Sequence, residues 1–302
     1  MGLEVETFEI GKLTRCQKID QSQGRGEYAY HSRLSKMKKG YVGLITWCRG
    51  RGGEQNTLRT YGLPPSHSEE LIIQIPSESA QHASDKYEKA ACKAYGFWQH
   101  SSFIGYSSYL YKKGVGSYGI RFCSSEKYGN AAVVPMHDEN GKLWSCQILN
   151  DNGSKRMIAG SRAKGLFHRL KEPKNGDIIG IAESYVTAAT CMELSGIPMV
   201  SCFSADNMPL VAASIRKLYP RSSIILFADN DRHLEERGLK NKGLLMAKKA
   251  IDVVGKSICM IEPEFVGVAP SKDASDWNDL LRIQGAKFTI EFIKEKIERA
   301  DV

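Results

Sequence analysis

From residue 177 onward, short apolar runs alternate with helical segments, and this alternation restricts the fold of the chain more than any other feature of its sequence. The strand-like runs span residues 177–183, 198–203, 222–231 and 257–263, and the helical segments span residues 184–196, 207–219, 241–254 and 276–298. A strand that is apolar along its length is buried on both faces, and such strands separated by helices form a parallel sheet with right-handed crossovers. The pattern predicts an α/β domain over residues 173–302, with helices flanking a parallel sheet.

The preceding segment has a different pattern, which predicts a smaller α+β subdomain over residues 79–172. It begins with an alanine-rich stretch at 79–98 whose apolar residues have helical spacing. Strand-like runs follow at 118–122, 131–136 and 143–149. The turn Asp-Glu-Asn-Gly at 138–141 separates the last two runs, and we expect a β-hairpin there because Asn-Gly tolerates the positive φ angles of tight turns.

Basic residues are concentrated in the first half of the chain. The chain has 42 Lys and Arg against 34 Asp and Glu, and residues 1–170 hold 24 of the basic but only 15 of the acidic residues. Between residues 12 and 59, 11 basic residues face three acidic ones and are interleaved with tyrosines and Trp47. Basic side chains neutralise phosphates and exposed aromatic rings stack on unpaired bases, so this mixture suits single-stranded nucleic acid. The alternative is a solvated basic β-surface whose aromatic residues belong to a core.

Residues 1–78 are expected to form this basic, strand-rich module. The alternating pattern from residue 27 to 47 predicts antiparallel strands, followed by a glycine-rich turn at 49–53. Arg49 and Arg51 in this turn are candidates for contact with nucleic acid.

The cysteines and the hydropathy exclude two other classes of protein. Eight cysteines are scattered along the chain without a CxxC pair, whereas structural zinc normally uses paired ligands, so we expect reduced thiols and no zinc. No apolar run approaches the roughly 18–20 residues that a bilayer span requires, and the N-terminus has no apolar signal segment. These features predict a cytoplasmic protein that does not contact a membrane.

Acidic side chains follow two of the predicted parallel strands. Glu183 ends the first strand, and Asp229 and Asp231 end the third. In extended backbone residues i and i+2 point the same way, so Asp229 and Asp231 present two carboxylates on one side while Asn230 turns away. The carboxyl ends of parallel strands face one crevice, and three carboxylates there would repel each other without a cation. Oxygen ligands select Mg²⁺ or Mn²⁺ over zinc, although a solvated acidic strand end would show the same residues.

Several segments of the chain resemble the motifs of one family. Residues 183–188 (ESYVTA) are similar to its EGYATA motif, and residues 228–231 (ADND) to its DxD motif. The other matching segments are 108–115 (SYLYKKGV), which is similar to HPYLxRKG, 134–143, which resembles the family's hairpin, and 276–280 (DWNDL), which is similar to DfNDL. Over about residues 85–285 the chain thus resembles the alpha-type primases of satellite phages and conjugative plasmids, whose catalytic domain is a TOPRIM domain. Ser184 stands where the family pattern has glycine.

The resemblance implies a TOPRIM-type sheet and the synthesis of short primers on single-stranded DNA from nucleoside triphosphates. It implies a two-metal site in which Asp229 and Asp231 are ligands and Glu183 is a ligand or general base, consistent with in-line phosphoryl transfer. In this interpretation Asp273, Asp276 and Asp279 extend the metal cluster. A helix N-cap is an equally good role for Asp276.

Basic residues before the sheet are candidates for holding the template and the incoming nucleotide: Lys112, Lys113, Lys155, Arg156, Arg162 and Lys164. The first two are suggested by their family position. The other four lie in a glycine-punctuated stretch that allows the backbone to approach phosphates, although a solvated hairpin face would look the same.

The family also suggests partners and a setting. Its members often carry a zinc-binding domain or continue into a helicase, and here we expect neither. A separately encoded replicative helicase is a candidate partner, in the replication of a phage, plasmid or other mobile element inside a bacterial or phage-infected cell.

Two other functions remain compatible with the sequence. A TOPRIM nuclease would use the same carboxylates on a water nucleophile, and a non-catalytic replication accessory protein would bind single-stranded DNA through the basic residues. A topoisomerase is disfavoured, because the rest of the chain is too short for a large cleavage domain with a nucleophilic tyrosine.

Overall fold

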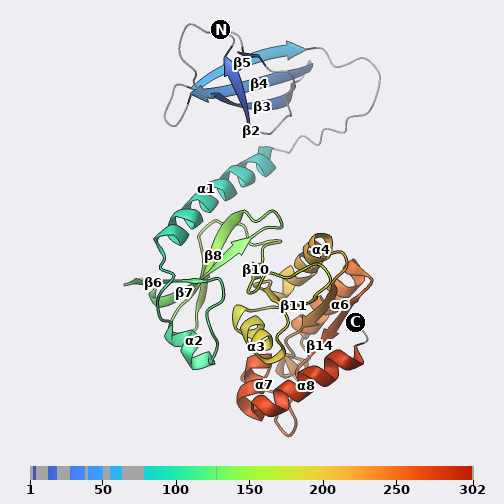
Figure 1. Cartoon of the computed structure of the whole chain (residues 1–302). Coiled ribbons are helices and arrows are strands. Elements are labelled where there is room, and N and C mark those ends of the chain that lie inside the picture. The colour runs from blue at the N-terminus through green and yellow to red at the C-terminus, as the bar shows by residue number, and fades with distance from the viewer. Residues whose placement is uncertain are drawn as a thin grey trace. The chain divides into compact units, whose positions relative to one another are not determined.

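The computed structural model describes residues 3–4, 13–18, 28–37, 40–49, 55–62, 78–126 and 128–300, with side chains described from residue 85 onward. The chain divides into two compact units, residues 1–81 and 82–302, which are considered separately (Figure 1). The boundaries expected after residues 78 and 172 both stay predictions, and the second of them falls inside the second unit.

The first unit contains a five-stranded antiparallel sheet in the order β1-β2-β3-β4-β5. Its strands are β1 (Leu3–Glu4), β2 (Leu13–Lys18), β3 (Tyr28–Met37), β4 (Gly40–Arg49) and β5 (Gln55–Gly62). The antiparallel strands expected over residues 27–47 are therefore confirmed as β3 and β4. Arg49 is the last residue of β4, and its side chain lies outside the described part of the chain, as does all of Arg51.

The second unit contains most of a long helix, which starts four residues before the boundary, and a four-stranded antiparallel sheet in the order β6-β7-β8-β9. Its elements are α1 (Glu78–His100), α2 (Ser108–Lys113), β6 (Arg121–Ser125), β7 (Gly129–His137), β8 (Leu143–Leu149) and β9 (Lys155–Met157). The expected hairpin is the β7–β8 pair. In its turn, Asp138 accepts hydrogen bonds from the N–H groups of Asn140 and Lys142, and Gly141 has a φ of +79°.

A five-stranded sheet in the order β10-β12-β11-β13-β14 follows. Its strands are β10 (His168–Arg169), β11 (Ile178–Ala182), β12 (Met199–Ser201), β13 (Ser223–Phe227) and β14 (Ile258–Ile261). The last four are parallel, as the sequence predicts, whereas β10 adds an antiparallel edge. Two residues are too few to show a strand pattern in the sequence, which is why β10 was not expected.

Helices cover both faces of this sheet. They are α3 (Tyr185–Ser195), α4 (Met208–Leu218), α5 (Arg232–Glu235), α6 (Lys242–Val254), α7 (Trp277–Gln284) and α8 (Ala286–Arg299), with a 3₁₀ turn at Ala205–Asn207. Residues of α3, α7 and α8 belong to one hydrophobic cluster and residues of α4 and α6 to another. Figure 1 shows these two groups of helices on either side of the sheet. Along β13, Ile224 and Leu226 lie in the second cluster and Ile225 in the first. Both faces of β13 are therefore buried, which explains its continuous apolar run.

The first of these clusters also reaches the antiparallel sheet. It contains Leu110 of α2 and Val134 of β7 together with Val186 of α3 and Trp277 of α7. The opposite face of the antiparallel sheet packs on α1, where Ala94 joins a small separate cluster. The two sheets of this unit thus share one continuous core.

A buried histidine makes the stability of this unit depend on pH. His168 of β10 lies against the backbone carbonyl of Tyr118, with a 2.8 Å hydrogen bond from its Nε2. Burial lowers the pKa of His168 from 6.5 to about 4, with the Tyr118 hydrogen bond opposing that change. Protons then bind the unfolded chain more tightly, so stability is retained above about pH 6.5 and lost as the pH falls toward 4. At 1.36 kcal/mol per pKa unit, the loss amounts to about 3 kcal/mol.

We therefore expect His168→Gln, which keeps a donor for the carbonyl, to flatten the pH dependence of the free energy of unfolding. Urea denaturation of both proteins between pH 7 and 4 measures this. Parallel curves for the two proteins would contradict the prediction.

Two observations concern the cysteines and the membrane-spanning segments considered in the sequence analysis. The six described cysteines are free thiols, and Cys146, Cys191 and Cys202 are buried. Within the described residues, no helix has both the length and the apolar character needed to cross a membrane.

Candidate active site

The carboxylates predicted from the strand ends lie at one edge of the parallel sheet. Glu183 directly follows β11, and Asp229 comes two residues after β13 ends. These strands are hydrogen-bonded neighbours with Ala182 opposite Phe227, so their carboxyl ends lie side by side. The sheet therefore brings Glu183 next to Asp229 and Asp231, as expected.

Mutual repulsion and burial change the acidity of these groups. Burial raises the pKa of Asp229 well above its usual value, and the charges of Glu183, Asp276 and Asp231 raise it further. Burial also raises the pKa of Glu183, and Asp231 adds to this effect. Lys155 opposes the change at Glu183 and at Asp229. Lys242 also lowers the pKa of Glu183, so the site is a cluster of carboxylates with more than one ammonium group nearby.

The loop after β13 is held by asparagines. Asn230 is buried, and its side chain turns to the carbonyl of Pro263 and to Asn241, with distances of 3.2 and 2.9 Å. Asn241 also accepts a hydrogen bond from the N–H of Asp231 and caps α6. Asn230 thus points away from the cluster, as the alternation of extended backbone predicts.

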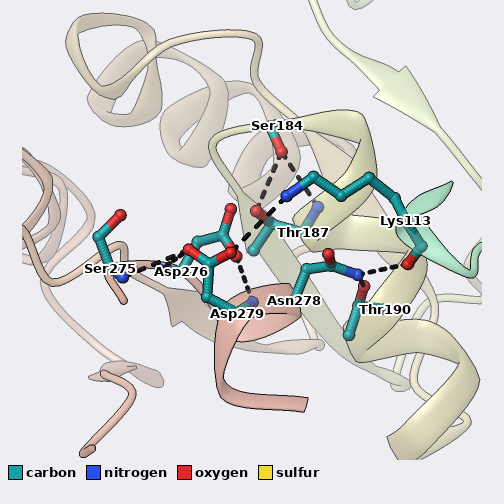
Figure 2. Close-up of polar contacts among 8 residues, drawn as sticks. All are labelled: Lys113, Ser184, Thr187, Thr190, Ser275, Asp276, Asn278 and Asp279. Carbon is teal, nitrogen blue, oxygen red and sulfur yellow. Dashed lines mark hydrogen bonds and ion pairs between the residues drawn. The ribbon is translucent and has the colours of Figure 1, made fainter. Parts of the chain in front are cut away.

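Asp276 and Asp279 form a capping box at the start of α7. Asp276 Oδ1 accepts the N–H of Asp279 at 2.8 Å, and Asp279 Oδ2 accepts the N–H groups of Asp276 and Ser275 at 3.3 Å each (Figure 2). Burial raises the pKa of Asp276, and Asp279 raises it further, while Lys113 and Lys155 lower it. The N-cap alternative for Asp276 is therefore confirmed, and a role for either residue in binding metal stays a prediction.

The predicted basic residues divide into two groups. Lys113 reaches the acidic edge, with its Nζ 3.6 Å from Asp279 Oδ1, and the charge of Lys155 acts on Glu183, Asp229 and Asp276. Lys155 is itself exposed, as are Lys112, Arg156 and Lys164, and Arg162 lies over the ring of Trp144. Asp273 is also exposed, in the segment before α7.

Ser184 fits the position where the resembling family has glycine. It caps α3 and accepts the N–H of Thr187 at 3.0 Å (Figure 2). Its φ of −108° is extended backbone that any residue can adopt, so the loop geometry does not require glycine.

Two residues of the site were missed by sequence reasoning. Gly243 of α6 lies so close to Asp229 that a β-carbon there would overlap the Asp229 carbonyl oxygen. Asn278 of α7 is fully buried and donates to the backbone of Lys113. Asn278 lies within the DWNDL segment, but the sequence carries no signal of its partner.

The donor set fits a divalent cation, although the side chains are not placed as a ready chelate. Within the side chains described by the structure, no three His, Cys, Asp or Glu residues are close enough together to hold a metal ion. However, Asp229 Oδ1 is buried without a hydrogen-bond partner, and the charges of three other carboxylates act on Asp229. Buried charge without compensation is costly, and an oxygen-only donor set is the type that Mg²⁺ and Mn²⁺ prefer. A metal site formed by Glu183, Asp229 and Asp231 therefore stays a prediction.

Comparison with known proteins identifies the fold of this domain. Residues 178–287 match the family model described as Toprim domain. These residues include the parallel sheet from β11 to β14 and all of the acidic residues discussed above. The resemblance of this part of the chain to a TOPRIM domain is therefore confirmed.

The chain is also similar to two curated proteins of Escherichia coli described as DNA primase TraC. One is 25% identical over 258 residues, which are 81% of this chain and 23% of that protein. The other is 28% identical over 204 residues, which are 65% of this chain and 14% of that protein. The chain thus spans less than a quarter of the length of either relative.

Similar solved structures include two primase fragments. The primase fragment of the bacteriophage T7 primase-helicase is 19% identical with a TM-score of 0.46, over 64% of this chain and 76% of that one. The zinc-binding and RNA polymerase domains of the Aquifex aeolicus primase are 13% identical with a TM-score of 0.48, over 72% of this chain and 61% of that one.

Proposed function

We propose that this protein is a DNA primase, a nucleotidyltransferase that joins nucleotides into short primers on a single-stranded DNA template. The observation that carries the proposal is the similarity to DNA primase TraC over 81% of this chain, a span that is larger than the Toprim domain alone. The cluster of Glu183, Asp229 and Asp231 at the strand ends supplies the chemistry that this reaction needs. The motifs at residues 183–188 and 276–280 further support an alpha-type primase.

In this proposal the acidic residues prepare the site for phosphoryl transfer. Mg²⁺ or Mn²⁺, when bound as a pair, supplies the positive charge that stabilises an in-line displacement. Asp229 and Asp231 would hold the metal, and Glu183 would hold metal or accept the proton of the attacking 3′-hydroxyl. Asp276 and Asp279 organise the start of α7 beside them.

The basic residues would handle the substrates. Lys113, whose Nζ is 3.6 Å from Asp279 Oδ1, and Lys155, whose charge acts on Glu183 and Asp229, would contact the triphosphate of an incoming nucleotide. Lys112, Arg156, Arg162 and Lys164 would contact phosphates of the template at the surface. We place the protein in the cytoplasm of a bacterial or phage-infected cell, in the replication of a mobile element, with a separately encoded helicase as a partner.

One assay separates the proposal from its alternatives. The protein is incubated with Mg²⁺ or Mn²⁺, circular single-stranded DNA and labelled ribonucleoside or deoxyribonucleoside triphosphates. Short labelled oligomers that require the template are the expected result. Loss of the circle without synthesis would instead identify a nuclease, and binding without either reaction would identify an accessory protein.

The basic first unit gives a prediction on template affinity. Each phosphate contact to a single strand contributes about 0.7 to the slope of log affinity against log salt. We therefore expect the double variant Arg49→Ala, Arg51→Ala to bind an oligothymidylate more weakly and with a slope shallower by about 1.4. Fluorescence anisotropy between 50 and 300 mM NaCl measures this. If the slope of log affinity against log salt equalled that of the unchanged protein, a role of the first unit in template binding would be contradicted.

A further inference from the structure

We infer that Asn278 is a positioning residue, which fixes Lys113 at the acidic edge so that its ammonium group binds the phosphates of a nucleoside triphosphate. The inference rests on the proposed function, because it takes a nucleotide as the substrate. Asn278 would not touch the nucleotide but would act through Lys113.

Asn278 joins three helices at one buried point. It lies in the first turn of α7, and its Nδ2 donates to the carbonyl oxygen of Lys113 and to Thr190 Oγ1, both at 2.9 Å (Figure 2). Lys113 is the last residue of α2, where carbonyl groups lack partners within the helix. Thr190 belongs to α3, the helix that begins just after Glu183. The amide of Asn278 therefore ties the end of α2 to α3, which begins two residues after Glu183, and to α7, whose first turn contains Asp279.

This arrangement is costly for stability, which points to a functional reason for it. Asn278 is fully buried, and its Oδ1 has no hydrogen-bond partner. Leaving a buried carbonyl oxygen unpaired costs about 1–3 kcal/mol. Leucine would fill a similar volume without that cost but could not hold the Lys113 carbonyl. The donor group of asparagine is thus the property that the position requires.

The side chain of Lys113 is available to a ligand. Its Nζ is 3.6 Å from Asp279 Oδ1, which is longer than a hydrogen bond, and the side chain is 22% exposed. Asp279 accepts hydrogen bonds from two backbone N–H groups through its other oxygen. A triphosphate carries more negative charge than one carboxylate and can therefore displace this loose contact. Asn278 thus holds the backbone of Lys113, and the ammonium group can exchange its long ion pair with Asp279 for a phosphate.

The test measures binding of Mg·ATP directly, without template or synthesis. Isothermal titration compares the unchanged protein with Asn278→Leu, Lys113→Ala and the double variant. We expect Asn278→Leu to weaken binding about 10-fold, as expected for loss of a charged phosphate contact. In the Lys113→Ala background the same substitution should change the dissociation constant by less than 2-fold, because residues acting through one another are not additive. Thr289→Val, which changes a buried threonine of α8 that does not contact Asn278, is the matched control and should bind within 2-fold of the unchanged protein.

Several outcomes would overturn the inference. These are additive effects in the double variant, an unchanged dissociation constant in Asn278→Leu, or no binding of Mg·ATP by the unchanged protein. If Asn278→Leu does not fold, as judged by its melting temperature, Asn278→Ala removes the same donors and takes its place. Failure of the primase proposal shows separately, as absence of template-dependent synthesis by a protein that still binds nucleotide.

Discussion

Replacing Asp229 by asparagine is expected to reduce primer synthesis by more than about 100-fold, since even partners in the outer shell of a metal site cost roughly 10–100-fold. The same substitution is not expected to lower the melting temperature in metal-free buffer. Burial and the charges of Glu183, Asp276 and Asp231 hold the pKa of Asp229 far above its usual value, so the carboxylate is unfavourable in the folded protein. A neutral amide of the same shape removes that repulsion. The substitution should therefore reduce primer synthesis without reducing the stability of the fold, a trade-off that is common at functional sites.

Synthesis on single-stranded DNA and thermal denaturation with EDTA measure the two effects. Asp252→Asn is the matched control, because Asp252 is an exposed aspartate of α6 with no role in the proposed site. It should retain activity within about 2-fold. Full synthesis by Asp229→Asn would show that the site lies elsewhere.

Gly243→Ala is expected to damage the site without removing any of its chemical groups. The new β-carbon would overlap the carbonyl oxygen of Asp229, which is backbone and cannot rotate away. Either α6 or the loop after β13 must then shift. Overpacking of this kind costs about 1–3 kcal/mol, which lowers the melting temperature by roughly 2–10 °C in a domain of this size. A displacement of 1 Å in a catalytic group can cost about 100-fold in rate, so synthesis should fall by a similar factor.

Gly96→Ala is the control for this substitution. Gly96 is also helical, in α1, but a β-carbon there would meet nothing within 4 Å. Because alanine is favoured over glycine in helices by about 0.5–1 kcal/mol, the control should be slightly more stable and fully active. If Gly243→Ala and Gly96→Ala had the same melting temperature and the same rate of synthesis, the close approach of Gly243 to Asp229 would not matter for stability or activity.

The parallel sheet could be predicted from sequence because its central strands are buried on both faces. β13 reads as an unbroken apolar run since Ile224 and Leu226 face one core and Ile225 faces the other. The helices around it have clear ends, such as the cap at Ser184 and Gly196 with its φ of +75°. β10 could not be predicted, because two residues contain no periodicity and its pairing with β12 depends on the finished sheet.

The site could be predicted only as far as it depends on strand ends. Glu183, Asp229 and Asp231 follow strands directly, so their proximity is a consequence of the parallel topology. Lys155 was expected to bind phosphate, but its effect on the carboxylates depends on the pairing of β9 with β8. The partner of Asn278 lies 165 residues away along the chain, and nothing in the local sequence of either residue indicates the contact.

The continuous core shared by the two sheets of the second unit determines how this unit unfolds. Leu110 and Val134 on one side of the expected 172/173 boundary pack in the same cluster as Val186 and Trp277 on the other. A core that crosses a boundary couples the two parts, so residues 82–302 should unfold in a single cooperative transition. Expressing residues 173–302 alone would expose the apolar surface that the antiparallel sheet covers. The acidic edge and its lysines are thus parts of one folding unit. Local unfolding of the segment that carries the lysines should therefore also unfold the segment that carries the carboxylates.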